Sequence, residues 1–341
     1  MTMQTRNQQL VTVIVILAIS VTVLVVVYDV IAQTYVLHNH VRHNDVKRTR
    51  DVKLLKVITP ASHHGSSLNN TFVSHGLMGR LGNVLFQYAA MYCIAKRNNL
   101  TPLFSDPMEL KNVENPGTLV NYSVYLSKKS RTQLLRERFC CSYDNRFESL
   151  PNDHNYSIYG YFQSWRYFEP CKAEVLEIFK FKKKYVEEAN TIIGDLRKQL
   201  PNKVLVGVHI RMEDHTSERA TRNGKQIAPP EYFIRAMTYF KNRFHDVRFV
   251  VITSSQEWWL SNVTRSDDVV FHNRTQPAVD MEILSRLDHI IVSVGTFGWW
   301  AAYMNNGVVV IFNDCFKPGS PYGNQFLHNS TDYFYPGWLR M

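Results

Sequence analysis

The alternation of apolar runs and helical segments in its C-terminal part constrains the fold of this 341-residue chain most strongly. Five apolar runs have the length of buried strands: 204–210, 248–253, 269–271, 289–294 and 308–312. Four stretches between them have helical character: 229–243, 255–260, 277–287 and 297–305. Strict alternation of strands and helices is typical of a parallel, doubly wound sheet. The sequence therefore predicts a Rossmann-like α/β unit in this part of the chain.

A second, shorter α/β pattern lies nearer the N-terminus. A strand at 72–74, a glycine turn at 79–82, a helix at 83–97 and a strand at 100–104 would form a βαβ unit. The mixed pattern of residues 105–200 predicts no order of elements. Two Rossmann-like halves with a cleft between them are the simplest architecture that fits both patterns.

Polar residues follow the predicted strands where parallel α/β sheets bind their ligands, beyond the carboxyl ends. This rule selects residues 211–215, 253–255 and 295–298. Arg211 is a permanent cation whose planar fork matches phosphate oxygens. A surface ion pair of Arg211 with Glu213 or Asp214 is the alternative interpretation.

Two glycine-rich turns lead into predicted helices. In the turn at 295–298, backbone N–H groups and the helix N-terminus could bind a phosphate, although Thr296 could equally be a plain N-cap. The turn at 79–83 has the same character and places Arg80 and Asn83 near its mouth. Both turns are candidate phosphate-binding segments.

The N-terminal region predicts a membrane anchor. Residues 10–28 carry no charge and would span roughly 28 Å as a helix, close to the thickness of the hydrocarbon core. A cleaved signal peptide, with a cleavage site at 30–32, is the less favoured alternative. The polar, His-rich stretch that follows predicts a flexible stem. The expected organisation is: tail 1–9, anchor 10–28, stem 29–71, N-terminal half 72–200, C-terminal half 201–341.

Glycosylation sequons favour a lumenal position for everything after the anchor. Seven Asn-x-Ser/Thr triplets occur where about three would be expected by chance. They begin at Asn69, Asn99, Asn121, Asn155, Asn262, Asn273 and Asn329.

The five cysteines match no metal-ligand spacing, and no metal site is predicted. In an oxidising lumen, Cys140 or Cys141 could pair with Cys171 or Cys315. Cys93 lies in a predicted helix and is interpreted as a small buried apolar residue.

The net charge of +10 would permit a polyanionic partner, but nucleic acid is excluded as the expected one. Much of the basic excess lies in residues 42–56, which predict no fold. Neither a zinc-finger spacing nor an RNA-binding aromatic signature accompanies it.

Four segments together resemble the α-1,2-fucosyltransferase family, glycosyltransferase family 11, within the α-1,2/α-1,6/O-fucosyltransferase superfamily. They are Gly79 to Asn98, Gly160 to Phe168, Val206 to Asp214 and Pro277 to Tyr303. The resemblance implies a two-domain GT-B fold, with the acceptor side in 72–200 and the donor side in 201–341. It also implies a single-pass type II Golgi membrane protein that uses GDP-fucose and a galactose-containing glycan acceptor without a metal.

The resemblance implies roles for residues of the donor half. His209 and Arg211 fall on the His-x-Arg-Arg motif that grips the donor diphosphate. Asp280 falls where the superfamily reads the guanine edge. Met212 replaces the second Arg of the motif, which leaves donor affinity and acceptor choice in question.

Two further pairs of residues match family loops. Thr296 and Phe297 fall on the loop that closes over the diphosphate, and Arg80 and Asn83 fall on the loop that faces the donor sugar. Arg80, His209, Arg211, Asp280, Thr296 and Phe297 are thus the expected donor-binding residues.

The expected reaction is attack of an acceptor hydroxyl on the fucose anomeric carbon, with inversion of configuration. Arg211 and Asn83 are candidate catalytic residues, and Asp214 is the candidate general base, with Glu213 as the alternative. Other fucosyl linkages (α-1,6 or protein O-fucosylation) and a non-catalytic sugar-nucleotide-binding or lectin-like protein are rival hypotheses. A soluble Rossmann oxidoreductase is disfavoured, because no acidic residue follows a glycine fingerprint by about 20 positions.

Overall fold

The computed structural model describes residues 71–104, 108–114, 132–212, 216–327 and 330–341. The predicted tail, anchor and nearly all of the stem lie outside the described residues, as do Glu213 and Asp214. In the part that is described, no helix is both long and apolar enough to cross a membrane. All described residues belong to one compact unit.

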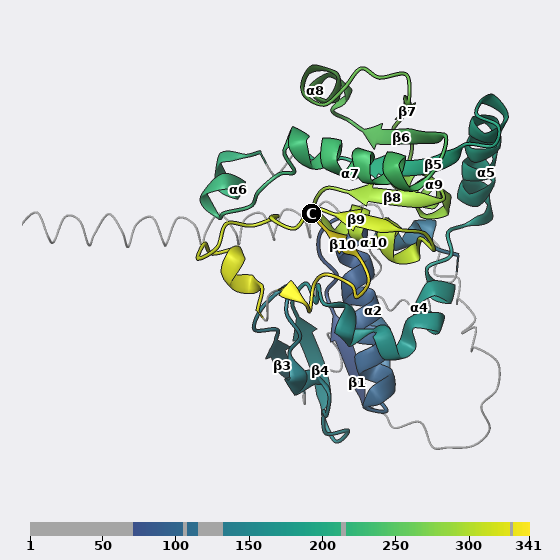
Figure 1. The fold of residues 1–341 in the computed structure, drawn as a ribbon. Coiled ribbons are helices and arrows are strands. Elements are labelled where there is room, and N and C mark those ends of the chain that lie inside the picture. The colour runs from purple at the N-terminus through teal and green to yellow at the C-terminus, as the bar shows by residue number, and fades with distance from the viewer. Residues whose placement is uncertain (1–70, 105–107, 115–131, 213–215, 328–329) are drawn as a thin grey trace, which may run out of the picture. The chain divides into compact units, whose positions relative to one another are not determined.

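The C-terminal half is built on a six-stranded parallel sheet in the order β10-β9-β8-β5-β6-β7 (Figure 1). Its strands are β5 (Val204–His209), β6 (Val247–Thr253), β7 (Val269–Asn273), β8 (His289–Val292), β9 (Val309–Ile311) and β10 (Leu339–Arg340). Counted from β5, the order is that of dinucleotide-binding folds. The chain leaves β5 in one direction through β6 and returns on its other side through β8, so the switch point lies between β5 and β8.

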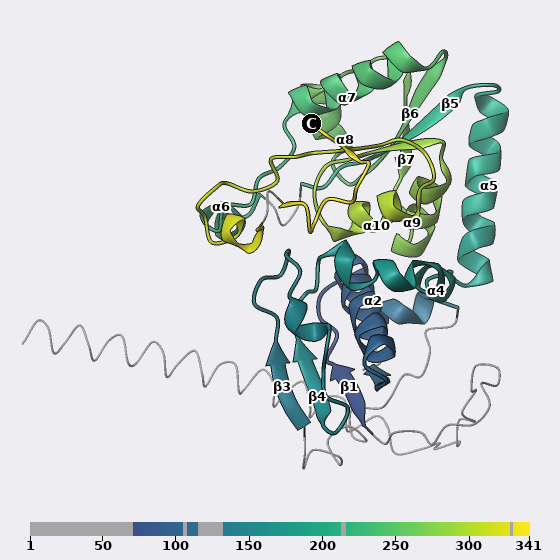
Figure 2. The same ribbon diagram turned by 60° about the horizontal axis from the view of Figure 1, so that its bottom comes forward.

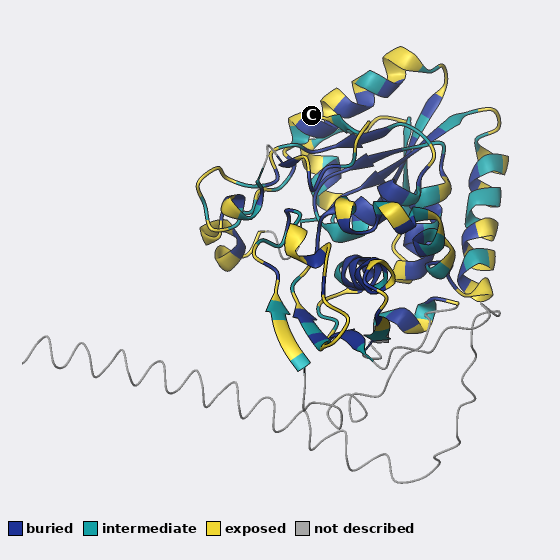
Figure 3. Cartoon of the chain, turned by 90° about the horizontal axis from the view of Figure 1, so that it is seen from below, coloured by how far each residue is buried: buried dark blue, intermediate teal, exposed yellow. Residues whose placement is uncertain are grey.

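Helices cover both faces of this sheet. They are α5 (Lys183–Gln199), α7 (Pro230–Arg243), α8 (Gln256–Asn262), α9 (Pro277–Arg286) and α10 (Thr296–Met304), while the short α6 (Glu218–Arg222) lies away from the strands. Figure 2 shows α7 on one side of the strands and α9 and α10 on the other. β5 and β6 are buried along almost their whole length, as strands covered on both faces must be (Figure 3).

The N-terminal half contains a four-stranded parallel sheet in the order β2-β1-β4-β3. Its strands are β1 (Phe72–His75), β2 (Thr101–Phe104), β3 (Thr132–Arg136) and β4 (Asn155–Tyr159). The helix α2 (Leu81–Arg97) connects β1 to β2, and α4 (Lys172–Ile178) follows the sheet. Because β1 pairs with β4 in parallel, the segments that follow these two strands lie at the same edge.

A cluster of aromatic side chains packs α2 against α10 and so joins the two halves. Phe86 on α2 lies 4.5 Å from Trp299 and 5.1 Å from Trp300, measured between ring centroids. Phe168 stacks on Trp300 at 5.2 Å. All four side chains are fully buried. This packing determines how the segments after β1 and β4 face those after β5 and β8.

The structure corrects the interpretation of Cys93. It forms a disulfide with Cys171, at a Cα–Cα distance of 6.0 Å, which ties α2 to the start of α4. Cys140, Cys141 and Cys315 are free, so the expected pairing of Cys140 or Cys141 with Cys171 or Cys315 is wrong. The helical position of Cys93 was predicted correctly, but sequence does not reveal which partner a helix face meets.

The predicted strands and helices of both patterns are confirmed, with ends that differ by a few residues. The region left without an order, 105–200, contributes β3, β4, α4 and α5. Several short 3-10 helices occur there as well: Met108–Asn112, Asn145–Phe147, Trp165–Tyr167 and Glu169–Cys171. Such short elements have no sequence period long enough to identify them.

Candidate active site

A cavity of about 280 Å³ lies at the switch point of the larger sheet, beyond the carboxyl ends of its strands. It brings together every described residue of the predicted site: Arg80, Asn83, His209, Arg211, Asp280, Thr296 and Phe297. Gly79, Leu81, Gly82, Ile210, Ile252, Arg274 and Pro277 complete its lining. We call it the first cavity. Residues 253–255, which the strand-end rule also selected, are not part of this lining.

Two helix N-termini meet at the first cavity. A Cβ at Gly82, in the first turn of α2, would lie 2.5 Å from the backbone nitrogen of Phe297 in the first turn of α10. Neither helix has an acidic residue in its first turn or a side-chain cap. The N–H groups of both first turns and their helix dipoles therefore favour an anion here.

Arginine side chains add positive charge to this cavity. The backbone N–H of Arg211 donates to the hydroxyl of Ser293 (3.0 Å), which ties the end of β5 to the segment after β8. Gly295 has φ +92°, and a Cβ there would lie 2.8 Å from Arg211 Cδ. The Arg211 side chain thus crosses the turn that precedes α10. Arg274 follows β7 and enters the same cavity, which the sequence did not predict.

Asp280 is the buried carboxylate of the first cavity, with 1% of its surface exposed. Its Oδ1 accepts hydrogen bonds from the backbone N–H (2.9 Å) and the hydroxyl (2.8 Å) of Thr275. Its Oδ2 lies 3.7 Å from Nε of Arg274. The carboxylate is therefore held in place by one oxygen, while the other is near the Arg274 guanidinium.

His209 and Phe297 pack against each other on the cavity wall, with ring centroids 5.3 Å apart. A Cβ at Gly298 would lie 2.5 Å from His209 Nδ1, so only glycine allows α10 to approach β5 this closely. Met212, which replaces the second Arg of the family motif, packs against the hydrophobic core and lines neither this cavity nor the one described next.

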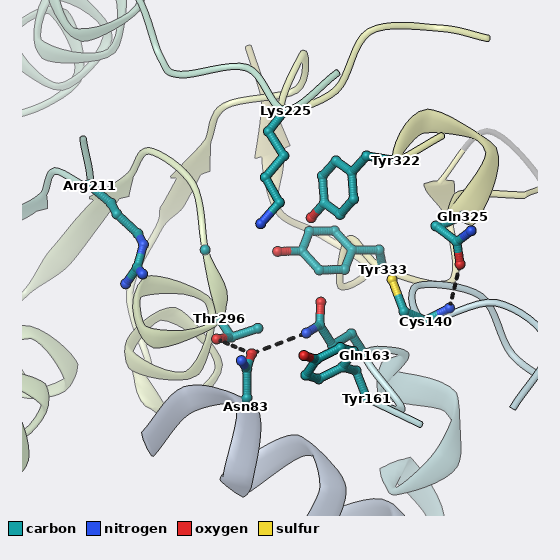
Figure 4. Close-up of a pocket in the computed structure, with 11 residues that line it drawn as sticks. Asn83, Cys140, Tyr161, Gln163, Arg211, Lys225, Thr296, Tyr322, Gln325 and Tyr333 are labelled. Carbon is teal, nitrogen blue, oxygen red and sulfur yellow. Dashed lines mark hydrogen bonds between the residues drawn. The ribbon is translucent and has the colours of Figure 1, made fainter. Parts of the chain in front are cut away.

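A second cavity, of about 410 Å³, adjoins the first (Figure 4). It shares Asn83, Arg211 and Thr296 with the first cavity. Its other lining residues are Cys140, Tyr161, Gln163, Lys225, Gly295, Tyr322, Gln325 and Tyr333. Among these residues are three tyrosines, two glutamines and a lysine. The three tyrosines make this cavity more aromatic than the first.

Asn83 is held at the point where the two cavities meet. Its Oδ1 accepts hydrogen bonds from the hydroxyl of Thr296 (2.9 Å) and from Nε2 of Gln163 (3.1 Å), as Figure 4 shows. One side chain thus connects α2, α10 and the segment after β4. The sequence predicted Asn83 and Thr296 but not Gln163, although Gln163 lies in the family motif at 160–168.

The turn that carries Tyr161 and Gln163 is strained and buried at its centre. Phe162 has φ +52° and is fully buried. Its N–H donates to Oε2 of Glu137 (2.8 Å), and Tyr167 donates its hydroxyl to Oε1 of Glu137 (3.3 Å). Burial raises the pKa of Glu137 to about 8. On the other side of the turn, His75 Nε2 lies 2.9 Å from the Gly160 carbonyl oxygen, and burial lowers the pKa of His75 to about 4.

Lys225, Tyr322 and Tyr333 lie far apart in sequence and carried no local signal of function. The backbone N–H of Tyr322 donates to the carbonyl of Asn223 (2.9 Å), and Lys225 bridges to Phe316. These bonds bring the C-terminal segment beside the loop that follows α6. In the described part of the chain, no group of three or more His, Cys, Asp or Glu side chains is arranged to bind a metal ion.

The chain is similar to known glycosyltransferases over most of its length. It is 26% identical to galactoside alpha-(1,2)-fucosyltransferase 2 of Sus scrofa, over 89% of this chain and 89% of that protein. It is 27% identical to galactoside alpha-(1,2)-fucosyltransferase 2 of Bos taurus, over 77% of this chain and 76% of that protein. Fucosyltransferase NodZ from Bradyrhizobium has a TM-score of 0.47 with 14% identity, over 68% of this chain and 91% of NodZ.

The sequence model of the family described as "Glycosyl transferase family 11" matches residues 44–341. This match includes every described strand and helix and both cavities. The predictions of family and enzyme class are therefore confirmed: the chain belongs to glycosyl transferase family 11 and is a glycosyltransferase.

Proposed function

We propose that this protein is an inverting galactoside α-1,2-fucosyltransferase that transfers L-fucose from GDP-fucose without a metal. The observation that carries the proposal is the meeting of two cavities at Asn83, Arg211 and Thr296. A transferase needs a donor site and an acceptor site that open onto one point, because the sugar passes between them. The first cavity is the donor site in this proposal, and the second is the acceptor site.

The charges of the first cavity support a nucleoside diphosphate donor. The guanidinium groups of Arg80, Arg211 and Arg274 and two helix N-termini supply positive potential without an ion. The buried Asp280 lines the same cavity, and its carboxylate suits the N–H donors of guanine, with Oδ2 as the oxygen that does not accept from Thr275. In this proposal the base lies near Asp280 and the diphosphate lies between Arg211 and the start of α10.

The proposed reaction is a single displacement. The acceptor oxygen forms a bond to the anomeric carbon as the bond from that carbon to the β-phosphate oxygen breaks, and guanosine diphosphate leaves. Negative charge grows on the leaving phosphate, where the Arg211 guanidinium and the N–H groups of Thr296 and Phe297 can stabilise it. The acceptor proton passes to a base, with Asp214 as the candidate, or to the departing phosphate.

The α-1,2 linkage and the galactoside acceptor of this proposal rest on the relatives, which are 26–27% identical and are named for both. The aromatic and amide side chains of the second cavity are compatible with a sugar acceptor. Another fucosyl linkage is the rival outcome, and analysis of the product decides between them.

We also propose that residues 10–28 anchor the protein in the Golgi membrane as a type II protein, with the site in the lumen. The uncharged segment and the seven sequons support this topology. Among the described sequons, Asn99, Asn262 and Asn273 are exposed, as attachment of a glycan requires. Removal of N-glycans by an endoglycosidase should increase the electrophoretic mobility of the full-length protein, and a lack of glycans would contradict this topology.

The function is tested with full-length protein in detergent, labelled GDP-fucose, a chelator and a β-galactoside disaccharide. We expect transfer in the presence of the chelator and a product that an α-1,2-specific fucosidase hydrolyses. A product that resists this fucosidase would refute the linkage. A strict requirement for manganese would refute the metal-independent reaction. No transfer from GDP-fucose to any sugar would refute the proposed activity as a whole.

A further inference from the structure

The side-chain amide of Asn83 has a defined polarity between the two cavities. Its Oδ1 accepts hydrogen bonds from Nε2 of Gln163 (3.1 Å) and from the Thr296 hydroxyl (2.9 Å), as Figure 4 shows. Its Nδ2 lies at the other end of the amide, where a Cβ at Gly79 would be 2.5 Å away. Gly79 lines the first cavity but not the second. The N–H groups of Asn83 are therefore turned toward the first cavity and its oxygen toward Gln163.

Gln163 is itself held in the orientation that presents an N–H to Asn83. Its backbone N–H donates to the carbonyl of Cys140 (2.7 Å). The thiol of Cys141 donates to Oε1 of Gln163 at 3.6 Å, so Nε2 is the end of the amide that remains for Asn83. Cys141 is fully buried and Gln163 is only 8% exposed, which leaves water little access to these bonds. A directed chain of hydrogen bonds thus runs from Cys141 through Gln163 to Asn83.

The orientation of the Asn83 amide decides what the first cavity offers to a ligand. In the orientation described, two N–H groups face the cavity, and they can donate to sugar or phosphate oxygens. With the amide reversed, a carbonyl oxygen would face the phosphate oxygens of a nucleotide, and no hydrogen bond could form between them. Gln163 lines only the second cavity, whereas Asn83 lines both. Any effect of Gln163 on a ligand in the first cavity therefore passes through Asn83.

We propose that Gln163 is a positioning residue that fixes the Asn83 amide with Nδ2 directed at the oxygens around the anomeric carbon of the donor. This inference rests on the proposed function, because it takes the first cavity as the donor site. Asn83 lies where the two cavities meet, which is where the sugar passes from donor to acceptor. An N–H group that is already oriented there stabilises the charge that develops on the leaving group without reorganisation.

The test compares Gln163→Met with Gln163→Glu, two side chains of similar size, in the full-length protein. Gln163→Met only removes the hydrogen bond to Asn83, so we expect kcat/KM for GDP-fucose to fall about fivefold. The carboxylate of Gln163→Glu accepts instead of donating, and it should turn Nδ2 of Asn83 toward itself. We expect this variant to lose about 10²-fold at pH 8. Gln133→Glu, whose exposed side chain lines neither cavity, is the matched control and should keep the wild-type rate.

A change of pH should restore the orientation in Gln163→Glu, because a protonated carboxyl can donate its O–H to Oδ1 of Asn83. Burial raises the pKa of such a carboxyl above its ordinary value of about 4.3. The kcat/KM of Gln163→Glu relative to that of Gln163→Met should therefore rise about tenfold or more from pH 8 to pH 5. This ratio cancels the titration of groups that both variants share, such as Glu137. A ratio that is the same at both pH values, or near one at pH 8, overturns the inference.

A double substitution tests whether Gln163 acts through Asn83. In an Asn83→Ala background, Gln163→Glu should change kcat/KM by less than about twofold, because the amide that it would turn is absent. The full loss in that background would show a general structural effect and overturn the inference.

Calorimetric binding of GDP-fucose separates this inference from the proposed function. Wild-type protein that binds GDP-fucose but transfers no fucose would refute the proposed function alone. In that case a higher Kd for Gln163→Glu than for Gln163→Met at pH 8 supports the positioning role, and equal Kd values overturn it. Wild-type protein that does not bind GDP-fucose would refute both.

Discussion

The hydroxyl of Thr296 donates a 2.9 Å hydrogen bond to Oδ1 of Asn83, although 213 positions separate the two residues in sequence. The bond joins the first turn of α10 to the first turn of α2, where the two cavities meet. It therefore links the packing of the two halves to the position of the Asn83 side chain.

Replacing the hydroxyl of Thr296 should reduce turnover more than stability. Thr296→Val keeps the shape of the side chain but removes one of the two hydrogen bonds described at Asn83 Oδ1, leaving the one from Gln163. A lost hydrogen bond of this kind is worth about 1 kcal/mol, so we expect kcat to fall by about five- to tenfold. Thr296→Ser restores the hydroxyl and should restore most of the rate. Equal kinetics for the Val and Ser variants would show that the bond has no part in the reaction.

Removal of the Arg211 guanidinium should abolish most of the activity without unfolding the protein. Loss of one group that stabilises transition-state charge costs about 10²–10³ in rate. The kcat of Arg211→Ala should therefore be lower than that of wild type by at least this factor, while its melting temperature stays close to that of wild type. Arg222→Ala is the control, since its side chain is exposed and, among the described residues, pairs only with Glu218 on the surface, at 3.6 Å. Wild-type turnover by Arg211→Ala would show that Arg211 has no catalytic role.

Two helical glycines should respond to alanine in opposite ways. A Cβ at Gly82 would meet the Phe297 nitrogen at 2.5 Å and the Thr296 carbonyl carbon at 2.6 Å, which are backbone atoms that cannot move aside cheaply. We expect Gly82→Ala to separate α2 from α10, to lower the melting temperature and to reduce activity. Gly194 in α5 has no atom within 4 Å of such a Cβ, so Gly194→Ala should stabilise the protein by about 0.5–1 kcal/mol. Calorimetry and initial rates measure both, and similar results for the two variants would contradict the close approach.

Glu137 should make stability depend on pH. Burial raises its pKa from an ordinary value of 4.5 to about 8, against the effect of hydrogen bonds from Phe162 and Tyr167 and with a small contribution from the Asp144 charge. Between these two values the folded state holds a proton that the unfolded state has released, so stability falls as pH rises. The burial of His75 acts in the opposite direction between about pH 4 and 6.5, because the unfolded imidazole binds a proton there that the folded one has released.

Glu137→Gln mimics the protonated side chain and isolates this effect. From pH 5 to pH 8, the unfolding free energy of wild type should fall relative to that of Glu137→Gln, by up to about 1.4 kcal/mol per pH unit. Denaturant titrations at several pH values measure it. A difference that stays constant over this range would show that Glu137 does not titrate there.

The Cys93–Cys171 disulfide should contribute to stability. It closes a loop with a sequence separation of 78, and native disulfides of this kind are typically worth about 2–5 kcal/mol. Reductant should lower the melting temperature of wild type but not that of a Cys93→Ala/Cys171→Ala double variant. Peptide mapping under non-reducing conditions should recover the two cysteines in one linked fragment; free thiols at both positions would disprove the bond.

The sequence by itself determined the larger sheet, the first βαβ unit and most residues of the first cavity. The strand–helix alternation predicted the larger sheet, because segments buried on both faces must be apolar along their length. The strand-end rule then selected Arg211 and Thr296, and the motif at 79–98 added Arg80 and Asn83. Each of these signals is local, since it depends on which residues are neighbours along the chain.

Only the tertiary structure decided which distant segments meet. The packing of Phe86 against Trp299 sets the approach of α2 to α10, and with it the contact of Asn83 with Thr296 and Gln163. Lys225 and the Cys93–Cys171 pair came to light in the same way. The contact of Asn83 with Thr296 follows from the docking of the two halves through a buried aromatic core, whereas the disulfide forms within the N-terminal half. Apolar periodicity records that a face is buried but not what covers it.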